Sequence, residues 1–172
     1  AEYNNYDTDY TGQGFDQLEQ VINKLKTDPY DRRMIITAWD PAHMNTMGLP
    51  PCLHTWQFNY LGGRLHLTGL QRSADTILGV SSDMVQGALL LHLMAQTVNM
   101  QPGTITLEFC NCHIYDNHIP VVKEHIEIWK NCEIPLPKLI LDSSANVFNF
   151  LPDMAKLENY QFAEKVKFDL AV

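Results

Sequence analysis

Two adjacent glycines between two strand-like segments place the strongest constraint on how this chain can fold. Residues 55–60 and 64–70 are rich in β-branched and aromatic residues, and Leu61-Gly62-Gly63 lies between them. This arrangement predicts a β-hairpin with a tight turn at the glycines. A sheet buries at least one face against other elements, so the hairpin predicts a layered domain rather than an isolated ribbon.

The remaining segments predict a mixture of strands and helices. Apolar residues at helical spacing predict an amphipathic helix over residues 14–27, ended by Asp28-Pro29. A long helix that is apolar almost all round is expected after Asp83, and another over residues 119–130. We expect an α+β fold in which a mixed sheet packs against buried helices. Four further short segments predict strands: residues 33–39, 104–109, 138–141 and 166–170.

Length and organisation favour one domain. The chain has 172 residues, of which 45% are hydrophobic, which is enough for one substantial core. It contains no repeats, low-complexity tracts or linker-like runs, so residues 1–172 are expected to form a single domain. The sequence opens at Ala1-Glu2-Tyr3 without a Met, and we expect an N-terminal part of that domain to be absent from it.

Charge and cysteine usage argue against several classes of function. The net charge is −8 at pH 7, and Arg32, Arg33 and Arg72 lie in two short motifs rather than along a basic face, so nucleic-acid binding is not expected. Polar residues interrupt the apolar stretch 84–100, which favours a buried helix over a membrane span. No signal peptide is visible, and the four cysteines form no CxxC pair, which favours a reducing cytoplasm.

A metal site is not expected either. Cys110 and Cys112, with His113, His118 and His125 nearby, offer donor atoms for a metal ion. Structural zinc sites usually combine paired ligands of recognisable spacing, which this set lacks. We therefore predict no metal.

Cys52 and Arg72 are the first candidates for chemistry. Cys52 follows Leu49-Pro50-Pro51 and precedes a predicted strand. It is either an inert buried thiol or a nucleophile, and a nucleophile needs a nearby cation to favour the thiolate. Arg72, in the motif Gln71-Arg72-Ser73-Ala74-Asp75, could supply that charge or grip a phosphate together with Ser73, unless it forms a surface ion pair with Asp75.

Arg32 and Arg33 present the same ambiguity. Adjacent residues of an extended segment point to opposite faces, so both can serve one site only if a turn or a second subunit intervenes.

Taken together, an ordered set of motifs closely resembles the thymidylate synthases. The set spans essentially the whole chain in order, which makes it far more specific than any one motif. Its members are Tyr10-Thr11-Gly12-Gln13-Gly14, Asp16-Gln17-Leu18, Asp28-Pro29-Tyr30-Asp31-Arg32-Arg33, Ala38-Trp39-Asp40-Pro41, Leu49-Pro50-Pro51-Cys52, Gln71-Arg72-Ser73-Ala74-Asp75, Leu78-Gly79-Val80, His113-Ile114-Tyr115-Asp116-Asn117-His118 and the closing Ala171-Val172.

The resemblance implies a thymidylate-synthase fold that dimerises through its sheet, and a catalytic centre at Cys52. Cys52 would attack C6 of the pyrimidine, with Arg72 and Ser73 holding the 5′-phosphate. The co-substrate would be 5,10-methylenetetrahydrofolate, without a metal. The implied roles of the other residues are these: Gln71 in the substrate site, Arg32 and Arg33 at the phosphate of the neighbouring subunit, His113 and Tyr115 at the sugar 3′-hydroxyl, Asp75 at the pterin, and Val172 as the closing terminal carboxylate.

One departure from the family pattern changes the expected base. Where thymidylate synthases have Gly-Val-Pro-Phe-Asn, this chain has Gly79-Val80-Ser81-Ser82-Asp83. An Asn amide matches uracil, whereas a carboxylate accepts from the 4-amino group of cytosine and can share a proton with N3. Ser81-Ser82-Asp83 is also a good helix N-cap sequence, and the two roles are compatible.

A second departure points the same way. The residue after the catalytic cysteine is usually His in thymidylate synthases, but here it is Leu53, with His54 next. Deoxycytidylate hydroxymethylases of DNA-modifying phages carry Asp at the base-reading position and lack that His, and this chain is similar to them at both points. Cys110 and Asn111 also differ from the family's Gly-Asp, which we expect merely to repack a strand end.

The leading hypothesis is therefore folate-dependent 5-hydroxymethylation of dCMP, with Cys52, Arg72 and Asp83 as the catalytic residues. A dCMP or dUMP C5-methyltransferase using the same cysteine is the nearest alternative, and CMP remains open as a substrate. From another class, the chain could be an inactive nucleotide-binding or regulatory homologue. The phosphate-loop arginine, the catalytic glutamate and the folate-side tryptophans of the family are expected upstream of Ala1, so the 172 residues alone are not expected to turn over.

Overall fold

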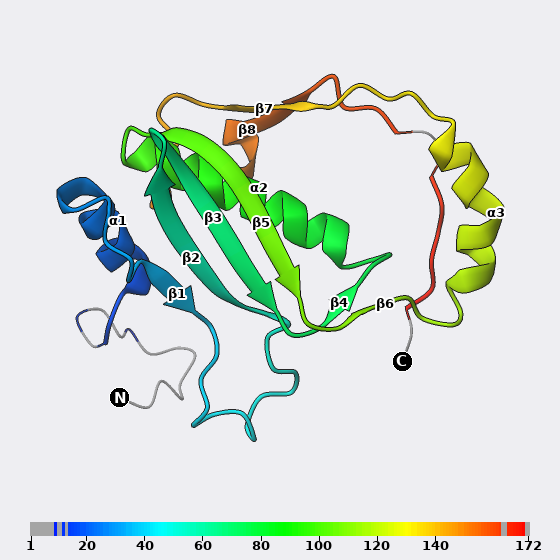
Figure 1. The fold of residues 1–172 in the computed structure, drawn as a ribbon, viewed down its shortest axis with the longest axis horizontal. Coiled ribbons are helices and arrows are strands. Elements are labelled where there is room, and N and C mark those ends of the chain that lie inside the picture. Colours follow the sequence, from blue (N-terminus) through cyan, green and yellow to red (C-terminus); the bar gives the residue numbers. More distant parts are fainter. Residues whose placement is uncertain (1–8, 10–11, 13, 163–164, 171–172) are drawn as a thin grey trace.

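The computed structural model describes residues 9, 12, 14–162 and 165–170, and Figure 1 shows their arrangement. Strands and helices are mixed along the chain. The elements, in chain order, are α1 (Gln17–Thr27), β1 (Ile35–Thr37), β2 (Leu53–Leu61), β3 (Arg64–Gln71), β4 (Ala74–Asp75), α2 (Val80–Thr97), β5 (Gln101–Phe109), β6 (Cys112–His113), α3 (Ile119–Lys130), β7 (Lys138–Leu141), the 3-10 turn η1 (Pro152–Met154) and β8 (Ala155–Glu158).

A four-stranded mixed sheet of order β1-β2-β3-β5 forms the centre of the protein. The β2–β3 hairpin predicted from the sequence is confirmed, and its turn places Gly62 and Gly63 at φ 59° and 79°, values that most other residues adopt only at a cost. Strand β5 joins β3 in parallel, and α2 provides the crossover between them. The expected α+β class with a mixed sheet is therefore correct.

The core lies between one face of the sheet and helices α1 and α2. Burial alternates along β3, so that Leu65, Leu67, Gly69 and Gln71 face inward. The other face of the sheet is open in Figure 1, where no element of the described chain crosses it. The core cluster consists of Val21, Ile22, Leu25, Met34, Phe58, Leu65, Leu67, Leu91, Met94 and Ala95.

Helix α2 approaches the sheet unusually closely because two glycines face the ring of Trp56. A Cβ atom on Gly87 would lie 2.7 Å from Cη2 of Trp56, and one on Gly69 would lie 2.7 Å from Cδ2 of Leu107. Neither position therefore has room for a methyl group unless the indole moves. The two glycines fix the distance between α2 and the sheet, and with it the position of the first turn of α2.

The predicted start and cap of the long helix and the predicted strand over residues 166–170 were wrong. Helix α2 begins at Val80 rather than after Asp83, and its N-cap residue is Gly79 without a side-chain cap. Asp83 therefore lies in the first turn, where its backbone N–H donates to Gly79 O, and it is not the capping residue. Residues 166–170 do not form a strand, and the carbonyl of Asp169 among them accepts from two side chains rather than from a neighbouring strand.

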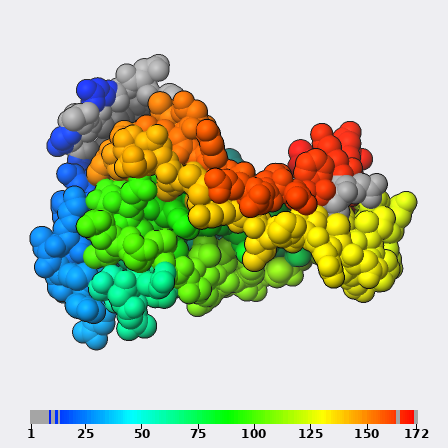
Figure 2. Space-filling model, turned by 90° about the horizontal axis from the view of Figure 1, so that it is seen from above, coloured from blue at the N-terminus to red at the C-terminus, as the bar shows by residue number. Residues whose placement is uncertain are grey.

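Helix α3 and the C-terminal segment lie away from the sheet (Figure 1). None of the residues of α3 is buried, whereas His118 directly before it is only 1% exposed. His118 Nε2 and Asn117 Nδ2 both donate to the carbonyl of Asp169, at 2.8 and 3.1 Å. These two bonds hold the C-terminal segment against the start of α3, and Figure 2 shows the two segments in contact.

Helix α2 is also less enclosed than its composition predicts. Met84 and Val85 are 51% and 63% exposed, because the first turns of α2 extend past the β5 edge of the sheet.

The described part of the chain contains no helix long and apolar enough to cross a membrane.

We predict that Gly87→Ala lowers the free energy of unfolding by about 1–3 kcal/mol, because an added methyl group would overlap Ile105 and Trp56. Alanine favours a helix over glycine by about 1 kcal/mol, so an unchanged or raised stability would contradict the close packing. Urea unfolding provides the measurement. Gly48→Ala is the matched control, because nothing lies within 4 Å of a Cβ atom at Gly48.

Candidate active site

Cys52 and Arg72 meet at one end of the sheet. Arg72 Nη2 donates to Cys52 Sγ at 3.7 Å, and the thiol is half-buried. The same guanidinium donates from Nη2 to Pro50 O at 2.7 Å and from Nε to Pro51 O at 3.1 Å. The structure thus brings together the thiol and the cation that the sequence proposed as partners. The alternative pairing of Arg72 with Asp75 is not formed.

The backbone explains why these two residues meet. Cys52 directly precedes β2 and Arg72 directly follows β3, so the antiparallel hairpin returns them to the same end. Arg72 N–H donates to Cys52 O at 2.9 Å, and the ladder register shifts between Leu53 and Thr55. This irregularity lets the Pro50-Pro51 carbonyls turn toward Arg72.

Gln71 links the last residue of β3 to the first turn of α2. Its side chain is buried at 2% exposure, and Nε2 donates to Ser73 O at 3.0 Å and to Asp83 Oδ2 at 2.7 Å. Asp83, half-buried in the first turn of α2, is thereby bound to the residue that directly precedes Arg72. The sequence assigned Gln71 to the substrate site without predicting this contact.

Asp75 and His113 are neighbours in a short parallel ladder. Strand β4 pairs with β6, with Asp75 opposite His113. The Asp75 carboxylate accepts from the backbone N–H groups of Ile77 and Leu78, at 3.0 and 3.3 Å, and so shapes the turn into α2. The ring of Tyr115 lies edge-on to that of His113, with centroids 5.0 Å apart. The motif of residues 71–75, which contains Arg72, and the motif of residues 113–118 therefore meet in this ladder.

One polar side chain near this site, Asn111, was not predicted to belong to it. Asn111 Oδ1 lies 2.9 Å from His113 Nδ1, a contact that fixes the ring and makes Nδ1 the donor. Asn111 therefore does more than the strand-end repacking that was expected of it, because it orients the ring of His113. No sequence pattern identifies such a contact, because it depends on the turn between β5 and β6.

His54 contacts Trp39 and the adjacent Thr55. Its ring contacts Trp39 edge-on at 5.6 Å, and Nδ1 lies 2.9 Å from Thr55 Oγ1. It therefore does not replace the histidine that the family carries one residue earlier. Val172 lies outside the described residues.

Arg32 and Arg33 lie far from Cys52 in the same chain. Met34 O accepts from Phe58 N, so the two arginines lie near the Leu61 end of β2, roughly 20–25 Å from its Cys52 end. Arg33 Nε donates to Asp31 Oδ1 at 3.0 Å, although the arginine side chain is 87% exposed. Of the sequence-predicted residues, the structure thus pairs Cys52 with Arg72, Gln71 with Asp83 and Asp75 with His113, and it places Arg32 and Arg33 at the opposite end of β2 from Cys52.

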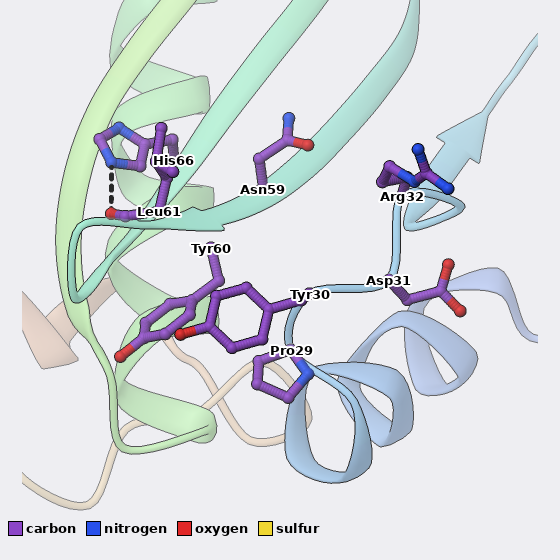
Figure 3. A pocket seen from close by; sticks show the side chains of 8 residues that line it. All are labelled: Pro29, Tyr30, Asp31, Arg32, Asn59, Tyr60, Leu61 and His66. Atoms are coloured by element: carbon purple, nitrogen blue, oxygen red, sulfur yellow. Dashed lines mark hydrogen bonds between the residues drawn. The ribbon is translucent and has the colours of Figure 1, made fainter.

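A pocket of about 380 Å³ lies at this distant end (Figure 3). Arg32 and the edge-on pair Tyr30 and Tyr60 contribute to its wall, and His66 closes one side through a contact with Leu61 O. The pocket belongs to the loop of residues 28–34 between α1 and β1, called the arginine loop below, and not to the Cys52 centre.

In the described residues, no group of three or more His, Cys, Asp or Glu side chains is arranged to hold a metal ion.

The fold and the site define an α+β protein with a cysteine thiol held beside an arginine at the end of a mixed sheet. The sequence model of the thymidylate synthase family matches residues 2–172. The chain therefore belongs to the thymidylate synthase family.

Individual relatives agree with this assignment. Thymidylate synthase of Saccharomyces cerevisiae is 38% identical over 183 residues, which cover 100% of this chain and 59% of that protein. Human thymidylate synthase is 37% identical over 173 residues, covering 100% of this chain and 54% of its own length. The structure of thermostable thymidylate synthase A from Bacillus subtilis superimposes with a TM-score of 0.85 at 30% identity, covering 98% of this chain and 60% of that one. The chain thus spans a little over half the length of these relatives.

The arginine loop generates a pH-dependent prediction. The hydrogen bond from the Arg33 side chain, followed by those from its backbone N–H and from Lys24, holds the pKa of Asp31 well below its usual range. A lowered carboxyl pKa stabilises the folded state above the unfolded value of about 4 and loses that contribution as the pH falls further. We expect the unfolding free energy of the unmodified protein to exceed that of Asp31→Asn at pH 7 and to approach it below pH about 4. A difference that stays constant in urea titrations from pH 7 to pH 3 would contradict this.

Proposed function

We propose that this chain carries the nucleotide site of an enzyme that transfers a one-carbon unit from folate to C5 of a pyrimidine deoxynucleotide, with Cys52 as the nucleophile. The observation that supports this most directly is the Arg72 guanidinium, which lies 3.7 Å from Cys52 Sγ and is itself anchored on two carbonyls. A cation held at that place stabilises a thiolate and can also bind a phosphate.

The chemistry follows from the properties of a pyrimidine ring. Addition of the Cys52 thiolate to C6 makes C5 electron-rich, so that C5 can attack the methylene carbon of the folate. Loss of the C5 proton and departure of tetrahydrofolate leave a methylene group on C5. Water adds to that group as the thiolate is expelled from C6, which restores the ring. 5,10-Methylenetetrahydrofolate supplies the one-carbon unit when it is bound. Arg72 and Ser73 hold the phosphate, while His113 and Tyr115 bind the sugar. In this proposal the Asn111 contact keeps His113 Nδ1 as a donor, which leaves Nε2 to accept from the 3′-hydroxyl.

We propose dCMP as the nucleotide and 5-hydroxymethyl-dCMP as the product. Asp83 carries a carboxylate where the family reads the base with an amide, and it accepts a hydrogen bond from Gln71 rather than capping its helix. A carboxylate fixed in this way suits the 4-amino group of cytosine. Water, rather than a hydride, would complete the reaction.

Methylation of dUMP is the second candidate, because relatives of this chain, among them those of yeast and human, are named thymidylate synthase. The Cys52–Arg72 pair serves either nucleotide equally well. The two proposals therefore differ at residue 83 and in the final acceptor of the reaction. Hydride transfer to dCMP and a ribonucleotide substrate are further variants of the same chemistry.

The position of the arginine loop supports a homodimer. Arg32 and Arg33 lie at the opposite end of β2 from Cys52, so they can reach a phosphate only in another subunit. One face of the sheet is left uncovered by the described chain, and two copies related by a two-fold axis would bury it reciprocally. Such a dimer would complete each site with two arginines from its neighbour.

The folate would bind in a pocket that begins directly after Asp75 in the sequence. A pocket of about 790 Å³ begins at Thr76 and Ile77 and continues past Trp129 to the C-terminal segment. Aromatic side chains suit the pterin and aminobenzoyl rings, and Lys165 suits the glutamate carboxylates. Asp75, which directly precedes the lining residue Thr76, would contact the pterin.

We expect the full-length enzyme to release tritium from C5 of labelled dCMP, in the presence of methylenetetrahydrofolate, roughly five- to a hundredfold faster than from dUMP. The factor follows from a buried mismatch at Asp83, which costs about 1–3 kcal/mol. A preference for dUMP would contradict the choice of base and favour the second candidate. Absorbance distinguishes the final step, because dihydrofolate accumulates only if a hydride is transferred.

A further inference from the structure

The side-chain amide of Gln71 has only one orientation that its surroundings allow. Nε2 donates both its hydrogens, one to Ser73 O at 3.0 Å and one to Asp83 Oδ2 at 2.7 Å. Both partners are acceptors, so reversing the amide would place Oε1 against two oxygens. The direction of the amide is therefore set by its partners.

The other end of the same amide is left without a partner. Gln71 is 2% exposed, and Oε1 is buried without a hydrogen bond to any described residue. A buried acceptor without a donor costs about 1–3 kcal/mol, so a glutamine kept here for stability alone would be a poor choice. The two Nε2 contacts, rather than general packing, account for this residue.

These contacts fix which atoms residue 83 can present. Gln71 requires an acceptor on its own side, and Asp83 Oδ2 meets that requirement. The remaining oxygen, Oδ1, is the atom that distinguishes an aspartate from an asparagine once the inner side is fixed as oxygen. With aspartate this atom accepts a hydrogen bond, and with asparagine it would be an NH2 group that donates one.

We propose that Gln71 is a positioning residue. By fixing the inner atom of the residue 83 side chain, it leaves the outer atom, Oδ1 in Asp83, to decide which base is bound. This inference rests on the proposed function, in which residue 83 reads the base. With Gln71 in place, the outer atom of residue 83 either accepts from the 4-amino group of cytosine or donates to the 4-oxo group of uracil. Without Gln71, an asparagine at position 83 can rotate by 180° and offer either group.

The test is a double-mutant cycle on the ratio of kcat/KM for dCMP to kcat/KM for dUMP. The four proteins are the unmodified enzyme, Asp83→Asn, Gln71→Met and the double variant. With Gln71 present, Asp83→Asn shifts the ratio toward dUMP by roughly ten- to a hundredfold. In the Gln71→Met background the same replacement shifts it at least tenfold less. Equal shifts in the two backgrounds would overturn the proposal.

A merely structural role for Gln71 gives a different result. Loss of folded protein lowers kcat for both nucleotides equally and leaves their ratio unchanged. Gln101→Met, at an exposed position that begins β5, is the matched control and should leave the ratio and its response to Asp83→Asn unaltered. If Gln71→Met fails to fold, Gln71→Leu also removes the donor, with the same expected result.

The proposed function and this inference fail separately. If the unmodified enzyme prefers dUMP, the proposed base is wrong, but the dependence of the Asp83→Asn shift on Gln71 is still measured. If turnover is too slow, the dissociation constants of dCMP and dUMP give the same ratio by calorimetry. An Asp83→Asn shift in binding that is independent of residue 71 would again overturn the positioning role.

Discussion

The guanidinium of Arg72 joins three consecutive residues of one loop to the end of the neighbouring strand. It donates to Pro50 O and Pro51 O and reaches Cys52 Sγ, while its own backbone N–H donates to Cys52 O. An arginine held by several bonds loses little further freedom when a ligand arrives, so the charge is already in place. The loop, the thiol and the proposed phosphate contact therefore depend on one side chain.

The rest of the site follows from how closely helix α2 approaches the sheet. Gly69 and Gly87 leave room for the indole of Trp56 and hold α2 against β3 and β5. This spacing lets Gln71, on the inner face of β3, reach Asp83 in the first turn of α2. The short β4–β6 ladder then brings Asp75 beside His113. Core packing thus sets the positions of residues whose roles are chemical.

Much of this could be predicted from the sequence because local patterns encode it. Gly62-Gly63 fixed the hairpin, and a hairpin necessarily returns Arg72 to the neighbourhood of Cys52. Apolar spacing located α1 and α3, although the sequence could not show that none of the residues of α3 is buried. The family resemblance supplied roles that no local pattern contains.

The misplaced and unforeseen features depend on contacts between distant residues. Ser81-Ser82-Asp83 has the composition of a cap, yet the bond from Gly79 N–H to Asp75 O starts the helix one turn earlier. Residues 166–170 have the composition of a strand, but the donors that hold them are Asn117 and His118, about fifty positions away. The Asn111 contact with His113 is equally invisible in composition. The distance between the arginine loop and Cys52 required the register of β1 on β2.

The most direct test of the central claim is intact-protein mass spectrometry after incubation with 5-fluoro-dCMP and methylenetetrahydrofolate. Fluorine at C5 cannot leave as a proton does, so the account predicts a stable covalent complex of protein, nucleotide and folate, mapped to the peptide that contains Cys52. Cys52→Ser should abolish the mass increase, and Cys132→Ser, at an exposed thiol remote in sequence, should retain it. An adduct that survives in Cys52→Ser, or no adduct from 5-fluoro-dCMP or 5-fluoro-dUMP, would contradict Cys52 as the nucleophile.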